Sequence, residues 1–386
     1  MKIGILIDRL NVGGVEKIAI EQVRALNKIC QNASLLILSR KAVVENAFTD
    51  LLQGIPVIYL DDRMPSLLRI SFRLPIFYFF SFFHVWYPLI LPFFIKKREF
   101  DYIVSHGTYT CFSALTVGKF REIPVSSFVW DPIGYILEKV YSSRFNAVVF
   151  AFLLNIARLL DKLIVDSSKY IFVGGTAHNA YLQSLNRNKK IIVTPPSTHI
   201  HAPSDGSKLT YCLLVTAWKE GKSPEYIIEI LKIIPSLKIK MAGKWIDPVY
   251  QATFVNLLKK YGFSDRVDVL GSVSEQELTL LYQNALFLLQ INDDRGFGMP
   301  ALEAAGCGTT FIIPRNQGVC ALFEDGVDGF YTDEKDTAQI TNKISILIQN
   351  QNMAQEMGKS AFVKVKEKYS WKKHAEFLLS VISDAN

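Results

Sequence analysis

The sequence has no C-x-x-C pair, no internal repeat and few low-complexity stretches. Its five cysteines are odd in number and widely spaced, which argues against a zinc site or a disulfide framework and favours a reducing cytosol. The N-terminal apolar run of MKIGILIDRLNVGG is too short for a signal peptide, because Asp8 and Arg9 close it, and a buried first strand is expected instead. With 386 residues, 49% of them apolar, the composition excludes disordered and solenoid proteins and predicts two folded domains.

Acidic residues are also absent between Arg63 and Arg98, where Lys and Arg side chains supply most of the net charge of +7. Between these basic flanks lies LPIFYFFSFFHVWYPLILPFFI, residues 74–95, which is long enough to span a bilayer. Three prolines interrupt it, and spanning would separate two expected strands of one sheet, residues 3–7 and 102–104. We therefore expect residues 63–98 to dock on an anionic membrane surface, with a pair of core helices as the alternative. The same confinement of charge argues against nucleic acid as a partner.

Strand-like and helix-like segments alternate along the chain, which is typical of parallel sheets covered by helices. In the first half, helices are expected over residues 15–29 and 145–162, and strands at KIGILID, SLLIL, PVIYL, DYIVSHG, VSSFVW, KLIVDSS and IIVTPPS. Residues 197–208, STHIHAPSDGSK, have the composition of a linker. A second alternation then runs from LTYCLLV to TTFIIP. Two Rossmann-like domains in series are the simplest account.

Five segments in order carry a more specific resemblance: VTAWKEGKSPEYIIEIL, LKIKMAGKWIDP, DRVDVLGSVSEQELTLLY, GFGMPALEAAGCGTTFIIPRNQGV and EDGVDGF. Together they resemble the nucleotide-binding domain of the family-4 retaining glycosyltransferases, within the glycosyl transferases group 1, which have the GT-B fold. GGVEK, DYIVSHG and YSWKKHAEFLL are similar to the family's glycine loop, strand ending in histidine, and closing helix. The resemblance implies an acceptor-side domain at residues 1–198, a nucleotide-sugar domain at 199–365 and a closing helix at 366–386 that packs back on the first domain, with a cleft between the two domains.

The residues themselves indicate an anion site at the start of one helix. Gly296, Phe297 and Gly298 allow the backbone to approach a ligand closely, and the helix that begins near Met299 directs its positive end toward that loop. The resemblance implies that Glu303 accepts hydrogen bonds from the ribose and that Lys222 balances the diphosphate. Alone, Glu303 would be a first-turn acid and Lys222 a solvated lysine. Gly13 and Gly14 are expected to form a glycine loop on the donor side, although the third glycine of a dinucleotide motif is missing.

The chain departs from the family pattern at four positions, Ala217, Trp130, Arg295 and Ala321. Arg295 stands where the family has its first glutamate, and Ala217 where an arginine usually accompanies the diphosphate lysine. Arg295 therefore either replaces the missing arginine as a second phosphate clamp or marks a site that has lost activity. Trp130 stands in place of a histidine, and Ala321 in place of an acid after the QGV loop.

Retention in this class implies front-face attack, in which positioning and charge stabilisation dominate and no protein nucleophile is required. The catalytic candidates are Lys222, Arg295 and Asp131, and the acceptor-side candidates are His106, Trp130 and Asp131. For Asp131 the alternative is turn chemistry before Pro132, and for His106 a satisfied loop histidine. Asp293 and Asp294 resemble a metal-binding pair only superficially, so no metal and no cofactor are expected.

These observations predict a retaining hexosyltransferase that uses a nucleotide sugar and a lipid-linked or glycan acceptor. Its expected place is the cytoplasmic face of a membrane, in glycolipid, polysaccharide or lipid-linked oligosaccharide assembly. The alternative is a non-catalytic GT-B subunit that supports a partner glycosyltransferase, since loss of activity would account for the four departures without compensation.

Overall fold

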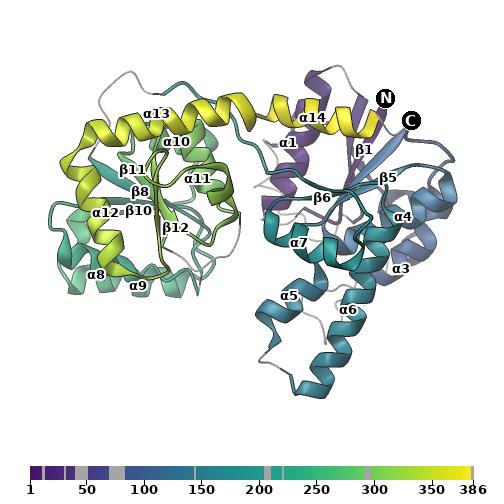
Figure 1. Ribbon diagram of the computed structural model, residues 1–386, viewed down its shortest axis with the longest axis horizontal. Coiled ribbons are helices and arrows are strands. Elements are labelled where there is room, and N and C mark those ends of the chain that lie inside the picture. The colour runs from purple at the N-terminus through teal and green to yellow at the C-terminus, as the bar shows by residue number, and fades with distance from the viewer. Residues whose placement is uncertain are drawn as a thin grey trace. The chain divides into compact units, whose positions relative to one another are not determined.

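The computed structural model describes residues 1–10, 14–29, 32–39, 51–68, 83–142, 145–203, 210–219, 221–291 and 297–383. The chain forms two compact units, the first made of Met1–Pro196 with Trp371–Asn386 and the second of Ser197–Ser370 (Figure 1). The divisions therefore follow Pro196 and Ser370, where the sequence suggests residues 198 and 365. Among the described residues, no helix has the length and apolar character needed to cross a membrane.

The first unit contains a seven-stranded sheet in which every pairing is parallel. Its strand order is β3-β2-β1-β4-β5-β6-β7, so the chain moves outward on one side of β1 and continues on the other side from β4. The strands are β1 (Lys2–Ile7), β2 (Asn32–Ile37), β3 (Val57–Tyr59), β4 (Tyr102–His106), β5 (Val125–Phe128), β6 (Ile171–Val173) and β7 (Ile191–Val193).

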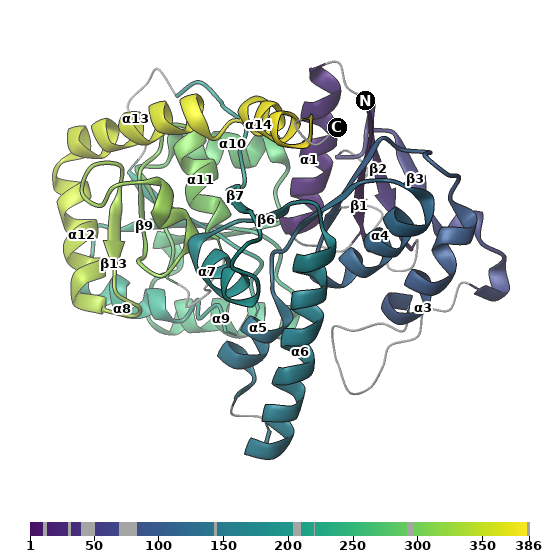
Figure 2. The ribbon, with the colours of Figure 1, turned by 45° about the vertical axis from the view of Figure 1, so that its right-hand side comes forward.

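Helices cover both faces of this sheet because alternate residues of a strand point to opposite sides. Ile3 and Ile5 of β1 pack with α1 and α14, which lie side by side in Figure 1, whereas Leu6 packs with α3 and α4. α6 and α7 join α4 on the latter face (Figure 2). The helices are α1 (Gly14–Lys28), α3 (Phe83–Ile90), α4 (Thr108–Arg121), α5 (Ile133–Val140), α6 (Ala147–Ser167), α7 (Thr176–Leu185) and α14 (Trp371–Ser383), with the 3-10 turns η1 (Asp61–Arg63), η2 (Ser66–Leu68) and η3 (Leu91–Phe94).

One expected strand is wrong. KLIVDSS, residues 162–168, contains the last turns of α6, and the strand β6 begins only at Ile171. Ile164 and Val165 are buried together with Ala157 and Asp161, a spacing that places all four on one side of a helix. The secondary structure of this β-branched run is therefore set by the burial of one helix face against the sheet, because tertiary burial outweighs strand propensity.

The apolar segment at residues 74–95 is described from residue 83 onward. Tyr87, Leu91 and Ile95 are buried in the core beneath α3 and η3, while Leu89 and Phe93 are exposed. This part of the segment therefore combines the expected core helix with outward apolar side chains. Its basic flank is partly balanced, because the guanidinium of Arg63 makes two hydrogen bonds, of 2.9 and 2.8 Å, to the Glu99 carboxylate.

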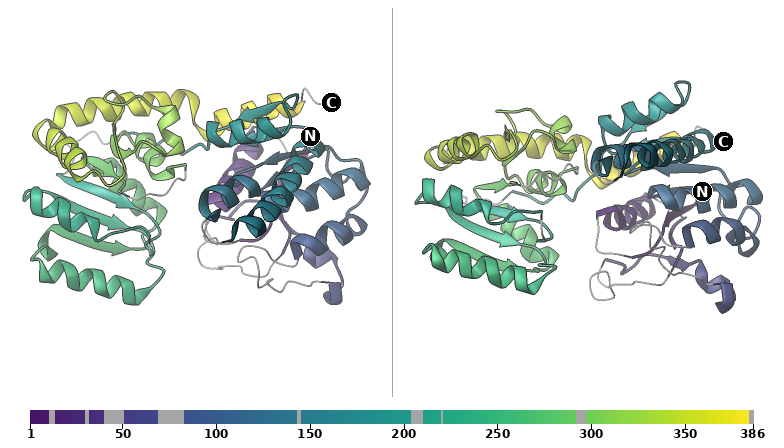
Figure 3. Two further views of the ribbon diagram at one scale, coloured as in Figure 1. Left: turned by 60° about the horizontal axis from the view of Figure 1, so that its bottom comes forward. Right: turned by 90° about the horizontal axis from the view of Figure 1, so that it is seen from below.

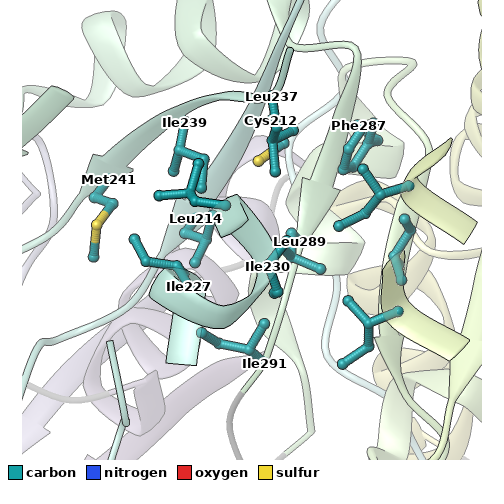
Figure 4. Close-up of a cluster of buried hydrophobic side chains, with 14 of the residues drawn as sticks. Cys212, Leu214, Ile227, Ile230, Leu237, Ile239, Met241, Phe287, Leu289 and Ile291 are labelled. Carbon is teal, nitrogen blue, oxygen red and sulfur yellow. The ribbon is translucent and has the colours of Figure 1, made fainter. Parts of the chain in front are cut away.

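The second unit contains a six-stranded parallel sheet with the order β10-β9-β8-β11-β12-β13 and helices on both faces (Figure 3). Figure 4 shows one of its cores, where Ile227 and Ile230 of α8 pack over side chains of β8, β9 and β11. The strands are β8 (Tyr211–Val215), β9 (Lys238–Ala242), β10 (Val267–Gly271), β11 (Phe287–Leu289), β12 (Phe311–Pro314) and β13 (Phe330–Thr332). The helices are α8 (Tyr226–Ile233), α9 (Pro248–Lys260), α10 (Glu275–Asn284), α11 (Met299–Gly306), α12 (Thr337–Gln349) and α13 (Gln351–Lys368), with the 3-10 turns η5 (Ser264–Arg266) and η6 (Gly318–Leu322).

Candidate functional site

The candidate donor site lies where the strand order of the second sheet reverses, between β8 and β11. Ligands of open parallel sheets bind outside the carboxyl ends of the strands at such a reversal. Lys222 follows β8, and Phe297, Gly298 and Met299 follow β11, the strand that pairs directly with β8. The fold thus brings these predicted residues to one edge of the sheet. Arg295 and Gly296 lie outside the described residues, as does Gly13 in the first unit.

Aromatic packing fixes the start of the loop that carries Lys222. The Trp218 side chain is buried, donates from Nε1 to the carbonyl of Ala242 at 3.1 Å, and stacks on Trp245 with the ring centroids 5.5 Å apart. Gly243 allows this close approach, because a Cβ there would lie 1.9 Å from the carbonyl oxygen of Thr216. The loop then brings Lys222 to a position where its side chain is only 8% exposed, which contradicts the interpretation as a solvated lysine.

Gly298 shapes the N-terminus of α11. It has φ of 90° and ψ of 42°, a left-handed conformation that favours glycine, and a Cβ would lie 2.4 Å from Gln317 Oε1. The carbonyl of Phe297 accepts a hydrogen bond of 2.6 Å from the backbone N–H of Val319, so the loop after β12 is tied to the start of α11. No side chain of the described residues caps this helix. Its first amide groups can therefore bind an anion.

Glu303 is held by a residue that the sequence does not point to. The buried hydroxyl of Tyr282, in α10, donates a hydrogen bond of 2.8 Å to the Glu303 carboxylate. Burial, and next the negative charge of Glu303, raise the pKa of Tyr282 well above its usual range, so the hydroxyl keeps its proton and remains a donor. Glu303 therefore has one carboxylate oxygen anchored inside the unit.

Removing this anchor tests the role of Glu303. We expect Tyr282→Phe to leave the fold intact but weaken nucleotide binding about tenfold, because a hydrogen bond to a charged group contributes roughly 1.5 kcal/mol or more to holding that carboxylate. Calorimetric titration of a nucleoside diphosphate into wild type and variant measures the change. Equal affinities would show that Tyr282 does not orient a ligand-binding group.

Three further polar side chains at the same edge have a buried oxygen with no hydrogen-bond partner among the described residues. Gln290 directly follows β11, Gln317 follows β12, and Thr332 ends β13. Buried polar groups are nearly always hydrogen-bonded, so these oxygens are acceptors or donors suited to water or a ligand. Gln317 is the first residue of the QGV loop in the family resemblance, whereas no motif of the sequence identifies Gln290 or Thr332, because single Gln and Thr residues after strands are common.

In the first unit, the strand order reverses between β1 and β4; the predicted residue Gly14 follows β1, and the predicted residue His106 is the last residue of β4. Gly14 is exposed at the start of α1. His106 is buried, and both of its ring nitrogens have hydrogen-bond partners: Nδ1 lies 3.2 Å from Trp130 Nε1, and Nε2 lies 2.9 Å from Gln22 Oε1. This arrangement matches the alternative of a satisfied histidine.

The chain of bonds continues to the C-terminal helix. Gln22 Nε2 lies 2.8 Å from Nε2 of His374 in α14, and the His374 ring also bonds the backbone of Pro195. Tryptophan can only donate, so Trp130 requires the neutral His106 that is protonated on Nε2. Burial, and next the positive charge of nearby His374, lower the pKa of His106 to about 3, and burial lowers the pKa of His374 to about 4. The side chains of this hydrogen-bond network, Trp130, His106, Gln22 and His374, are therefore all neutral.

Trp130 and Asp131, the other two predicted acceptor-side residues, differ in exposure. The Trp130 ring is partly buried, stacking on Phe128 and His106 with centroid distances of 5.5 and 6.1 Å. Asp131 is exposed, and its backbone carbonyl accepts a hydrogen bond of 2.7 Å from Thr108 Oγ1 at the start of α4. The structure therefore connects His106 with Trp130 and leaves the Asp131 carboxylate toward solvent.

No group of three or more His, Cys, Asp or Glu side chains within the described ranges is arranged to hold a metal ion. The described part of the donor site offers a buried lysine and helix amides instead. These groups suit an anionic ligand.

Comparison with known proteins agrees with this geometry. Residues 202–364, which lie in the second unit, match the model of the family described as glycosyl transferases group 1. The chain is 26% identical over 281 residues to an uncharacterized glycosyltransferase of Methanocaldococcus jannaschii, covering 72% of this chain and 74% of that protein. It is 25% identical over 166 residues to the D-inositol 3-phosphate glycosyltransferase of Mycolicibacterium smegmatis, an alignment that spans 42% of this chain and only 38% of that relative.

Among solved structures, the Anabaena protein HepE in complex with UDP and glucose superposes with a TM-score of 0.75 at 15% identity, covering 99% of both chains. The two parallel α/β units and this likeness show the GT-B fold.

Proposed function

We propose that this protein is a glycosyltransferase that moves a sugar from a nucleotide-diphosphate donor to an acceptor hydroxyl with retention of configuration. The observation that carries the proposal is the joint placement of a buried lysine and a helix N-terminus without a side-chain cap in the described residues, at one strand reversal of a group 1 domain. The HepE structure, described as a complex with UDP and glucose, supports a uridine nucleotide as the first donor to test.

The described residues have defined roles in such a transfer. The bond from the sugar's anomeric carbon to the β-phosphate oxygen breaks while the acceptor oxygen bonds the same face of that carbon, and the acceptor proton passes to the departing phosphate. Lys222 and the amides of α11 stabilise the developing phosphate charge, and Glu303 binds the ribose hydroxyls. Asp131 orients the sugar or the acceptor, with Trp130 and His106 on the acceptor side.

We propose further that the acceptor is lipid-linked or a glycan and that the protein works peripherally on the cytoplasmic face of a membrane. The exposed side chains of Leu89 and Phe93, followed by exposed Lys96, support the expected docking segment at residues 63–98. Apolar side chains next to cations suit an anionic lipid surface.

A donor scan with matched variants tests the transfer. We expect hydrolysis of, or transfer from, one nucleotide sugar by the wild type, and a loss of roughly 1.5 to 3 kcal/mol in transition-state stabilisation for Lys222→Ala and Glu303→Ala. Lys219→Ala, which removes an exposed lysine from the same loop, is the control and should retain activity. Full activity in both site variants would refute the assignment, and inactivity of the wild type with every donor would favour a non-catalytic GT-B subunit.

Arg295 is proposed to replace the arginine that the family usually has at position 217, where this chain has Ala217. Ala217 is exposed and directly precedes Trp218. A double-mutant cycle tests this replacement. We expect Arg295→Glu to weaken donor binding and the double variant with Ala217→Arg to recover it, by about 1 kcal/mol or more of coupling in the double-mutant cycle. Calorimetry on the four proteins measures this coupling. Additive effects would show that the two positions are independent, and a gain of activity in Arg295→Glu would show that Arg295 marks loss of function.

A further inference from the structure

The first unit has a large apolar surface on α6 that the transfer reaction does not use. Seven side chains of this surface are exposed, and apart from one adjacent pair they recur at intervals of three or four residues, which places them on one side of the helix opposite its buried residues. They are Phe145, which precedes the helix, and Val148, Val149, Phe152, Ile156, Leu159 and Leu163. Val148 is 81% exposed and Phe152 64%, so the described residues leave this surface uncovered.

Polarity changes along α6 as well as around it. Residues 145–157 include no charged side chain, whereas Arg158, Lys162 and Asp166 follow in the second half. These charges are locally paired, since Arg158 lies 3.3 Å from Glu138 of α5 and Lys162 lies 3.0 Å from Asp166. At about 1.5 Å of rise per residue, Ala147 to Arg158 spans about 16 Å, close to the roughly 15 Å of hydrocarbon in one lipid leaflet.

The uncharged half of α6 is the half that extends away from the sheet of its own unit. In Figures 1 and 2, α5 and the first turns of α6 project beyond the rest of the first unit, and the charged half lies against its other helices. A partner helix lying along α6 would favour a polarity difference across the helix axis only, as in a coiled coil. A gradient along the axis, from an apolar tip to ion-paired residues, instead fits an element whose tip enters the hydrocarbon of a lipid leaflet while its charged residues stay outside, because burying charge in hydrocarbon is costly.

α5 and α6, with the segment that joins them, form a helical hairpin, which we call the α5–α6 hairpin. It is attached directly to the predicted acceptor side of the first unit. α5 begins two residues after Asp131, and its first amides are held by the buried Asp161 of α6, which accepts from Ile133 N at 2.9 Å and Gly134 N at 2.8 Å. The hydroxyl of Tyr181 in α7 donates to the same carboxylate at 2.8 Å. The position of the apolar tip is therefore coupled through Asp161 to the segment that carries Trp130 and Asp131.

We propose that the apolar half of the α5–α6 hairpin enters the hydrocarbon of a lipid membrane and brings a lipid-linked acceptor to Asp131. The identity of the acceptor rests on the proposed function, whereas insertion of the hairpin does not. The hairpin is distinct from the basic segment at residues 63–98, and the two differ in salt dependence. Insertion driven by apolar burial persists at high salt, whereas attraction of surface cations to anionic lipid is screened.

Vesicle flotation tests the proposal. The triple variant Val148→Ser, Phe152→Ser and Ile156→Ser should bind vesicles of phosphatidylcholine and phosphatidylglycerol at least tenfold less than the wild type at high salt, where the attraction of the basic segment at residues 63–98 to anionic lipid is screened. The control carries Val249→Ser, Val363→Ser and Phe377→Ser, which remove exposed apolar side chains from α9, α13 and α14, and it should bind like the wild type. Circular dichroism confirms that all three proteins are folded.

Activity measurements separate this proposal from the proposed function. We expect the triple variant to hydrolyse the donor like the wild type but to lose at least tenfold in transfer to a lipid extract presented in vesicles. Unchanged flotation of the triple variant would overturn the hairpin proposal, even if donor hydrolysis supports the glycosyltransferase. A wild type that forms a dimer, and a triple variant that is monomeric with unchanged flotation, would assign the surface to a second copy of the chain instead. If no donor is hydrolysed, the proposed function fails, and flotation still decides whether the hairpin docks on lipid.

Discussion

Replacement of Gly298 by alanine should reduce nucleotide affinity by at least tenfold and lower the thermal stability of the second unit. The left-handed φ of 90° disfavours any side chain, and the added Cβ would lie 2.4 Å from Gln317 Oε1 and 2.7 Å from Val319 Cγ1. The backbone conformation alone costs roughly 1 to 3 kcal/mol for a residue other than glycine. Relief of the contacts would move the start of α11 or the loop after β12, and both border the proposed phosphate site.

Gly326→Ala is the matched control for this experiment. Gly326 belongs to the same unit and has φ of 81°, but a Cβ there would meet nothing within 4 Å. Both variants therefore carry backbone strain, and only Gly298→Ala combines it with close contacts at the site. Calorimetric titration of UDP measures affinity, and differential scanning calorimetry measures stability. A Gly298→Ala protein that binds UDP as tightly as Gly326→Ala would show that the start of α11 does not contact the nucleotide.

The second large effect is a loss of stability of the first unit as the pH falls. His106 and His374 have pKa values lowered from the usual 6.5 to about 3 and about 4 by burial. Below pH 6.5 the two histidines of the unfolded chain bind protons, whereas those of the folded chain stay neutral. The stability that the neutral histidines allow is therefore fully present above pH 6.5 and is lost progressively as the pH falls below it. At pH 5.5 each histidine lowers the free energy of unfolding by roughly 1 kcal/mol relative to neutral pH.

Urea unfolding followed between pH 7.5 and 5.5 measures this change, above the range in which ordinary carboxylates titrate. The double variant His106→Gln and His374→Gln should be less stable at neutral pH but lose less stability on acidification. Asp161 acts in the opposite direction, because burial raises its pKa and protonation favours the folded state. If the wild type is equally stable at pH 7.5 and 5.5, His106 and His374 are not held neutral in the hydrogen-bond network that runs from Trp130 to Pro195.

Local sequence patterns determine most of the secondary structure and the fold class. Alternating apolar strands and amphipathic helices predict parallel α/β units, and nearly all of the expected strands are present, because buried parallel strands leave a strong apolar signature. The glycine before α11 and the acid one turn later are also evident from the sequence, since the needs of a helix N-terminus are local. KLIVDSS shows the limit, because its apolar run fits a strand or a buried helix equally well until its neighbours are known.

Only the tertiary structure decides contacts between residues distant in the chain. The sequence does not show that Tyr282 holds Glu303, that Gln22 joins His106 to His374, or that Asp161 secures the start of α5. Each of these bonds links separate elements, so its partners are set by strand order and helix packing rather than by spacing. The exposed surface of α6 has the same origin: its composition fits a buried or a membrane-near helix, and only the packing shows which apolar side chains the sheet does not cover. Local propensity thus determines the elements, and packing determines which of their polar and apolar groups remain for function.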